Sequence, residues 1–93
     1  MRFEWDDQKA QINSKKHGVM FEEASTVFED SLAYIFEDKW HSVGEYREII
    51  IGHSAQGRLL LVCFTERGDG NIRLVSSRLA TKQERNTYYE HQR

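Results

Sequence analysis

Two apolar runs in the second half of the chain limit the folds that it can adopt. YREIIIGH (46–53) and RLLLVCFTE (58–66) are rich in branched side chains, and only SAQG separates them. Gly57 in this connection predicts a β-hairpin. A second turn, RGDGN (67–71), leads into IRLVSSR (72–78). Three strands joined by such short loops are expected to form an antiparallel meander.

Helical patterns flank this predicted sheet. Asp6 or Asp7 can cap the segment DQKAQINSKKH, and Gly18 stands where a helix ends in a left-handed conformation. The segment FEEASTVFED (21–30) repeats an apolar spacing that predicts a second short helix. Thr81 and Glu84 form a capping-box pattern, which predicts a last helix.

RFEW (2–5) and LAYIFED (32–38) complete the pattern as further strands. The predicted order is β-α-α-β-β-β-β-α, and the fold class is therefore α+β. We expect an antiparallel β-sheet meander with two N-terminal helices over one face and a C-terminal helix. A chain of 93 residues without a repeat or a linker makes one domain, residues 1–93.

The charges are distributed unevenly. The net charge is −2, but residues 1–46 hold five Lys/Arg against ten Asp/Glu, whereas residues 47–93 hold eight against five. Seven of those eight cations are arginine, whose planar fork of donors suits phosphate. A solvated strand face with scattered ion pairs is the plainer interpretation of the same composition.

Several function classes find no support in the sequence. The chain has no apolar run of about 18 residues and no signal-peptide pattern, so we expect no membrane segment and a cytoplasmic protein. The four histidines show no metal-ligand spacing, and no glycine-rich phosphate loop precedes a lysine. We therefore expect no metal and no cofactor. The single cysteine, Cys63, lies in an apolar run and is expected to be a small buried hydrophobe.

The last predicted strand carries the most suggestive cations. Alternation puts Ile72, Leu74 and Ser76 on one face and Arg73, Val75 and Ser77 on the other, with Arg78 on the first face unless the strand bends. Metal-free cleavage of RNA needs a base for the 2′-hydroxyl, an acid for the leaving oxygen, and cations for the charged intermediate.

His17 ends the first predicted helix, which leaves two roles open. As a cation it would be stabilised by the helix dipole and would bond the last free carbonyls. Alternatively it belongs to a site, with Asn13 one turn away to orient the ring.

The N-terminal third is similar to the BrnT toxin family. The matching positions are Phe3, Trp5, Asp6, Lys9, Ala10, Asn13, Lys16-His17-Gly18-Val19, Phe21-Glu22-Glu23-Ala24 and Val27-Phe28. Further matches are Glu45, Arg47, IGHS (51–54), GRLLLV (57–62), TER (65–67), IRLVSSR (72–78) and the ER…YYE ending (84–90). The chain departs from the family at Ser31, where proline is common, at Val75-Ser76-Ser77-Arg78, where Ile-Ser-Ala-Arg is usual, and in a C-terminal helix with fewer arginines.

This resemblance implies a RelE-like α+β fold and a toxin of a type II toxin–antitoxin pair. Members of the family are ribonucleases that block translation. Each pairs with an antitoxin, BrnA, which has a DNA-binding domain, and the complex represses its own operon. The resemblance thus implies an RNA substrate, a hetero-oligomer with a BrnA-like antitoxin, and operator DNA contacted only through that antitoxin.

The resemblance implies that the cations form an RNA-cleaving site. The predicted catalytic residues are Arg67, Arg73 and Arg78 for the phosphate, with His17 or Tyr88 to move protons. The residues predicted to guide the RNA backbone are Lys16, Arg47, Arg58 and Arg85. A different hypothesis is a non-catalytic module that only binds a DNA-binding antitoxin, for which the acidic N-terminal half is a suitable protein-binding face.

Overall fold

The computed structural model describes residues 1–92 of the chain. Nine elements follow one another: β1 (Arg2–Glu4), α1 (Asp7–His17), α2 (Phe21–Ser25), the 3-10 helix η1 (Thr26–Glu29), β2 (Tyr34–Glu37), β3 (Glu48–His53), β4 (Leu59–Glu66), β5 (Asn71–Leu79) and α3 (Lys82–Glu90). The predicted strands and helices are therefore present, with one difference in the second helix, which becomes a 3-10 turn after Ser25.

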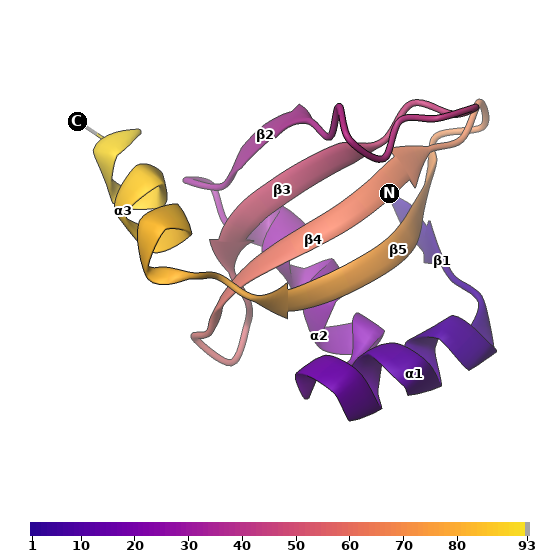
Figure 1. The fold of residues 1–93 in the computed structure, drawn as a ribbon, viewed down its shortest axis with the longest axis horizontal. Helices are drawn as coiled ribbons and strands as arrows, with labels where there is room; N and C mark the ends of the chain where they lie inside the picture. The colour runs from indigo at the N-terminus through magenta and orange to yellow at the C-terminus, as the bar shows by residue number, and fades with distance from the viewer. Residues whose placement is uncertain (93) are drawn as a thin grey trace.

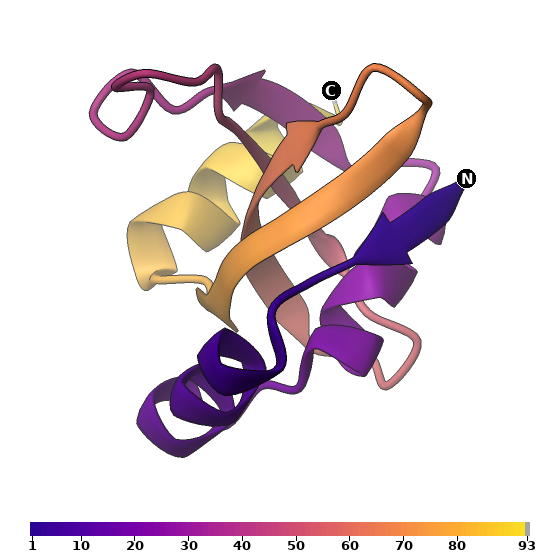
Figure 2. The same cartoon turned by 90° about the vertical axis from the view of Figure 1, so that its right-hand side faces the viewer.

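One five-stranded sheet has the strand order β1-β5-β4-β3-β2. Strands β2 to β5 pair antiparallel in sequence order, but β1 lies parallel to β5 (Figure 2). The sheet is thus mixed, and the prediction of an antiparallel meander is wrong at this edge. The reason is the connection: the chain leaves β1 directly into α1, so no hairpin joins β1 to its neighbour.

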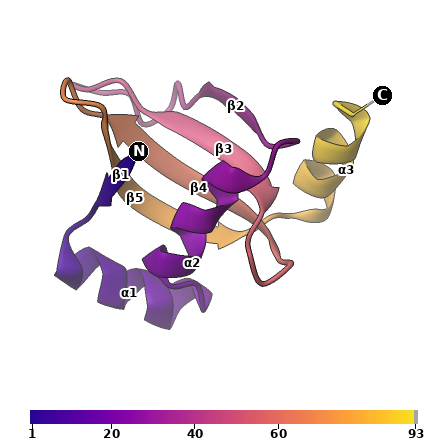
Figure 3. The ribbon, with the colours of Figure 1, turned by 180° about the vertical axis from the view of Figure 1, so that it is seen from behind.

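Helices α1 and α2 lie on one face of the sheet, and Figure 3, which views the molecule from that side, shows α2 crossing in front of the strands. Their apolar residues, together with those of β3, β4 and β5, form the main core, which consists of Val19, Phe21, Ala24, Val27, Ile50, Leu60, Val62, Phe64, Ile72 and Leu74. The expectation that the N-terminal helices cover one face is borne out by this packing. We call this the helix face.

On the opposite face, α3 packs against one end of the sheet (Figure 1). Tyr88 of α3 contacts a second, smaller core of Ile51, Leu59 and Leu61. The capping box that starts α3 is present, since the Thr81 and Glu84 side chains each bond the other's backbone N–H. The remainder of this face, which we call the open face, is the part that Figure 1 shows toward the viewer.

A β-bulge decides which side chains of β5 reach the open face. Cys63 of β4 pairs with Ser76, but the next residue of β4 pairs with Leu74, so Val75 is an extra residue. Arg73, Ser76 and Arg78 therefore lie on one face, opposite Thr65, Cys63 and Leu61 respectively. Simple alternation predicts Ser76 on the other face, Ser77 on this one, and Arg78 on the other face unless the strand bends. The bulge reverses the placement of Ser76 and Ser77 and is the bend that brings Arg78 to this face.

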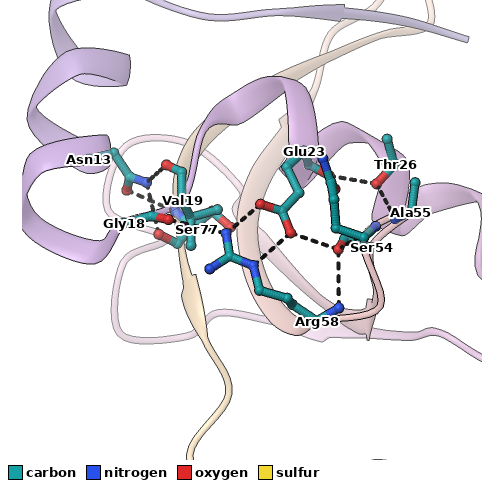
Figure 4. A network of polar contacts seen from close by, with 10 residues as sticks. Asn13, Gly18, Val19, Glu23, Thr26, Ser54, Ala55, Arg58 and Ser77 are labelled. Atoms are coloured by element: carbon teal, nitrogen blue, oxygen red, sulfur yellow. Dashed lines mark hydrogen bonds and ion pairs between the residues drawn. The ribbon is translucent and has the colours of Figure 1, made fainter.

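Asn13 fixes the end of β5 that lies beyond the bulge (Figure 4). Its side-chain amide donates to the carbonyls of Val19 and Ser77 at 3.0 and 2.9 Å, and its oxygen accepts from the Ser77 N–H at 3.0 Å. Because β1 pairs only as far as Arg73, Asn13 supplies backbone partners that a strand would otherwise provide. Asn13 thus attaches α1 to β5 and does not orient His17.

Gly52 should be intolerant of a side chain. A Cβ there would lie 2.7 Å from Ala33 Cβ, which packs against the core, and 3.0 Å from Val27 Cγ1, which is inside it. We expect Gly52→Ala to lower the free energy of unfolding by about 1–3 kcal/mol through overpacking. Urea denaturation measures the loss, and Gly68→Ala, with nothing within 4 Å, is the matched control. Equal stabilities of the two variants would contradict this packing.

Candidate functional site

A cavity of about 190 Å³ opens on the open face beside the bulge. Its walls come from β3, β4, β5 and the loop between β2 and β3. The lining residues are Asp38, His41, Arg47, Ile49, Leu61, Cys63, Val75, Ser76 and Arg78. An apolar floor therefore lies beneath two arginines, a histidine and a carboxylate.

The loop from Asp38 to Arg47 is closed by its own hydrogen bonds. The Asp38 N–H donates to the Arg47 carbonyl at 2.9 Å, and the Ser42 hydroxyl donates to the Asp38 carbonyl at 2.7 Å. The same hydroxyl accepts from the Arg47 N–H at 2.9 Å. These bonds bring His41 and Arg47, which are separated by most of the loop, to the same cavity.

His41 and Asp38 form a pair within this loop. Asp38 is buried, whereas the His41 side chain is 66% exposed, and His41 Nδ1 lies 2.8 Å from Asp38 Oδ2. A carboxylate only accepts hydrogen bonds, so it holds the proton on Nδ1 and leaves Nε2 as the basic nitrogen. This arrangement is a candidate acid–base group with a fixed ring orientation.

Arg78 is held by α3. Its two terminal nitrogens donate to the two carboxylate oxygens of Glu84 at 2.8 and 2.9 Å, and one of them also donates to the Leu79 carbonyl at 3.2 Å. The hydrogen bonds from Arg78 lower the pKa of Glu84 against the opposing effect of burial. Of the five guanidinium N–H groups, the Nε–H and one Nη2–H have no partner within residues 1–92, so Arg78 can still bind an oxyanion.

Arg47 stands on the opposite wall and is held more loosely. Its Nε donates to Glu45 at 3.2 Å through a single contact. A single partly exposed ion pair contributes little to stability, so the guanidinium can exchange this carboxylate for another anion at small cost. Arg47 and Arg78 therefore offer donors to one anion from two sides of the cavity.

A second cavity, of about 200 Å³, lies on the α1 side of the bulge. It shares Val75 and Ser76 with the first cavity, and its other walls are Lys9, Ile12, Asn13, Lys16 and His17. The predicted residues Lys16 and His17 thus lie across the bulge from Arg78. Within residues 1–92, Lys9 and Lys16 make no ion pair, which leaves their charges available.

The other predicted arginines do not gather at one point. Arg73 shares the open face with Arg78 but pairs with Glu4 at 2.9 Å. The residues of β4 opposite Arg73 and Arg78 are four residues apart, which corresponds to about 13 Å along the strand. Arg67 is in the β4–β5 turn and Arg85 is on α3, at opposite ends of the sheet (Figure 1). We expected Arg67, Arg73 and Arg78 to converge on one phosphate, and the structure does not bring these three side chains together.

Arg58 belongs to the other side of the molecule. Its guanidinium pairs with Glu23 of α2, with Nε 2.9 Å from Oε2, and also donates to the Gly18 carbonyl (Figure 4). This hydrogen bonding lowers the pKa of Glu23 despite burial. Arg58 thus ties the β3–β4 turn to α2, and the structure places it apart from both cavities.

The surroundings of Tyr88 indicate a role in stabilising the fold. It is buried, and its hydroxyl donates to Asp30 Oδ2 at 2.6 Å. Burial, and next the hydrogen bond to Asp30, raise the pKa of Tyr88 to about 12. Burial alone would raise the pKa of Asp30, but bonds from Tyr88 and the His53 backbone leave it lowered. Tyr88 therefore anchors α3 and is not brought to the cavity.

Sequence reasoning missed Asp38 and His41. Their spacing of three residues, in the segment DKWH, was the available signal, but a loop gives no periodicity with which to orient side chains. Within residues 1–92, no three His, Cys, Asp or Glu side chains cluster as metal ligands would. None of the helices in those residues is long and apolar enough to span a bilayer.

These observations define a small α+β protein with candidate acid–base and phosphate-binding groups on an open sheet face. Residues 5–84 match the model of the family described as "Ribonuclease toxin, BrnT, of type II toxin-antitoxin system". The chain belongs to this family, which consists of ribonuclease toxins that act with an antitoxin partner.

A solved structure supports the same conclusion. The crystal structure of the Brucella abortus ribonuclease toxin BrnT is 26% identical in sequence and has a TM-score of 0.69. The similarity covers 88% of this chain and 99% of that one. A comparison with curated proteins found no match.

Cys63 should be an unreactive thiol despite its position in the cavity wall. Burial, followed by the nearby Asp38, raises its pKa to about 11. Because the thiolate is the reactive form, we expect native Cys63 to react with a disulfide reagent at pH 8 at least ~100-fold more slowly than the urea-unfolded chain. Comparable rates in the two states would show that the thiol is not shielded.

Proposed function

We propose that this protein is a metal-independent endoribonuclease toxin that cleaves RNA and inhibits translation. The observation that carries the proposal is the His41–Asp38 pair, which lines one small cavity together with Arg47 and Arg78. An oriented base and anion-binding donors are two of the three kinds of group that RNA cleavage by the 2′-hydroxyl requires, and the third is an acid for the leaving oxygen.

The proposed reaction begins when His41 Nε2 takes the proton of the 2′-hydroxyl. The 2′-oxygen forms a bond to phosphorus, and the bond from phosphorus to the 5′-oxygen breaks. Arg47 and Arg78 donate hydrogen bonds to the non-bridging oxygens while the extra negative charge is present. His17 is the candidate donor of the proton that the leaving 5′-oxygen receives, because its cavity shares Val75 and Ser76 with the first. The products are a 2′,3′-cyclic phosphate and a 5′-hydroxyl.

The remaining cations contribute to binding in this proposal. Lys16, with Lys9 beside it, holds the RNA backbone on the α1 side of the bulge. Arg73 and Arg67 contact the RNA strand further along the open face, and Arg85 contacts the RNA from α3. Arg58 has its side chain engaged by Glu23, so its role is to hold the fold around the site.

The partner in this proposal is a BrnA-like antitoxin that neutralises the toxin. The complex represses its own operon, and DNA is contacted only by the antitoxin. The acidic N-terminal half, with five Lys/Arg against ten Asp/Glu in residues 1–46, supports this pairing because it suits a protein-binding face.

His41→Gln should abolish most of the cleavage of bare RNA in the presence of a chelator. Loss of a general base costs ~10²–10⁴-fold in rate. Asp38→Asn should lower the rate less, because the base remains but the carboxylate that orients its ring is lost. Gel assays of kcat/KM measure both, and His53→Gln is the control. Full activity of a folded His41→Gln protein would remove His41 from the mechanism.

Substitution of Arg78 and substitution of Arg73 should affect different kinetic constants. Arg78→Ala should lower kcat by ~10²–10³-fold, as removal of a donor to a developing oxyanion does. Arg73→Ala should mainly raise KM, because it contacts the strand away from the cavity. Both variants should arrest growth less than the parent on expression, and their melting curves check folding. Equal effects on kcat would contradict this division of roles.

The non-catalytic module is the second candidate, and one observation favours it. Arg58, Arg73 and Arg78 are each paired with a carboxylate, which reduces the cationic charge available to RNA. Such a protein would bind its antitoxin but leave transcripts intact and growth unaffected. Expression without the antitoxin separates the two candidates.

A further inference from the structure

Three aromatic rings form a row on the open face, between α3 and the β2–β3 loop. The rings of His91 and Tyr34 have centroids 4.0 Å apart at an interplanar angle of 30°. Tyr34 and Phe36 are stacked with centroids 5.4 Å apart at 29°. The row therefore begins at the end of α3 and finishes at Phe36, whose side chain is 38% exposed.

The row leads toward the cavity that holds His41 and Arg78. Phe36 pairs with Ile49, and Ile49 pairs with Cys63, so Phe36 is one strand away from the cavity wall and on the same face. Asp38 follows Phe36 by two residues. Tyr34 is also close to the Arg78 partner Glu84, whose charge, after burial, raises the pKa of Tyr34.

We propose that Phe36, supported by Tyr34 and His91, is a stacking platform for an unpaired nucleobase next to the scissile phosphate. Bases of single-stranded RNA stack on exposed aromatic rings, and every base has a face that suits this contact. A base beyond Phe36 extends the row, and its ribose phosphate then lies over the cavity that Arg47 and Arg78 flank.

The two faces of β2 point to RNA as the occupant of this row. Ile35, the neighbour of Phe36 on the strand, is 49% exposed and faces the other way, away from the cavity. On the side of Phe36, two arginines and His41 line the adjacent cavity. Aromatic rings beside guanidinium groups match the bases and phosphates of a nucleic acid strand. A protein partner that binds apolar side chains would bind the face with Ile35 as readily as the face with Phe36.

This inference rests on the proposed function and names its substrate class, which is single-stranded RNA. A paired base is already stacked and hydrogen-bonded within a helix, so duplex RNA cannot place a base on Phe36 without unpairing it. The platform is sequence-tolerant, because stacking uses the face of the base and not its edges.

The test is the affinity for a labelled six-nucleotide RNA in which every 2′-hydroxyl is methylated, so that binding is measured without cleavage. We expect Phe36→Leu, which keeps an apolar side chain but loses the ring, to weaken binding by ~5- to 150-fold. Ile35→Ala is the matched control on the opposite face and should bind as the parent does. A duplex of the same sequence should bind weakly to all three proteins, and circular dichroism confirms their folding.

A set of RNAs with one abasic position completes the experiment. At the position that stacks, loss of the base should weaken binding to the parent by a similar factor, and Phe36→Leu should lose no further affinity. The inference is wrong if Phe36→Leu binds every RNA as the parent does. It is also wrong if the loss of affinity from Phe36→Leu and the loss from the missing base multiply at every position of the RNA.

Two further outcomes separate this inference from the function on which it rests. If the parent shows the Phe36-dependent binding but cuts no RNA, the platform stands and the nuclease proposal fails. If Phe36→Leu leaves RNA binding intact and instead abolishes self-association in gel filtration, the row is a protein interface and the inference is wrong.

Discussion

The attachment of Asn13 to the backbone of Ser77 is the contact on which the rest of the open face depends. β1 accompanies β5 only as far as Arg73, and beyond that point the backbone of β5 requires other partners. Asn13 donates to and accepts from Ser77 and also binds Val19, so one amide joins a helix, a loop and a strand. Because these bonds are buried, a misfit would leave polar groups unpaired at a cost of about 1–3 kcal/mol each. The bulge at Val75 lies two residues before this contact and turns Ser76 and Arg78 toward the cavity.

The electrostatics of the site depend on placement more than on net charge. Arg78 is bound by Glu84, which also accepts from the Thr81 N–H in the capping box, so the start of α3 and the orientation of the guanidinium are set together. His41 is likewise oriented by Asp38, a carboxylate whose own position comes from the closed loop. Groups that are already oriented need no rearrangement when charge develops in a transition state. In the proposed function, this orientation compensates for the net charge of −2.

Local signals predicted the elements well, and long-range pairing limited the rest. The caps at Asp6, Gly18 and Thr81 and the turns at Gly57 and Gly70 act within a few residues, and the structure has them where the sequence predicts them. The parallel pairing of β1 and the bulge at Val75 arise from contacts between distant segments, which periodicity does not report. For the same reason alternation leaves the face of Arg78 dependent on whether the strand bends, and Tyr88 is a candidate by residue type although Asp30 engages its hydroxyl. A turn between Asp38 and His41 brings their side chains together, and Ser42 closes the loop that carries both to the same cavity as Arg47.

The chemistry of the cut ends tests the central claim most directly. Purified protein would be incubated with bare RNA and a chelator, and the termini of the fragments determined by mass spectrometry. Attack by the 2′-hydroxyl predicts 2′,3′-cyclic phosphate and 5′-hydroxyl ends, and a single 2′-deoxy substitution at the cleaved position should prevent the cut there. Fragments with 5′-phosphate ends, or cleavage that persists at the 2′-deoxy position, would contradict the account.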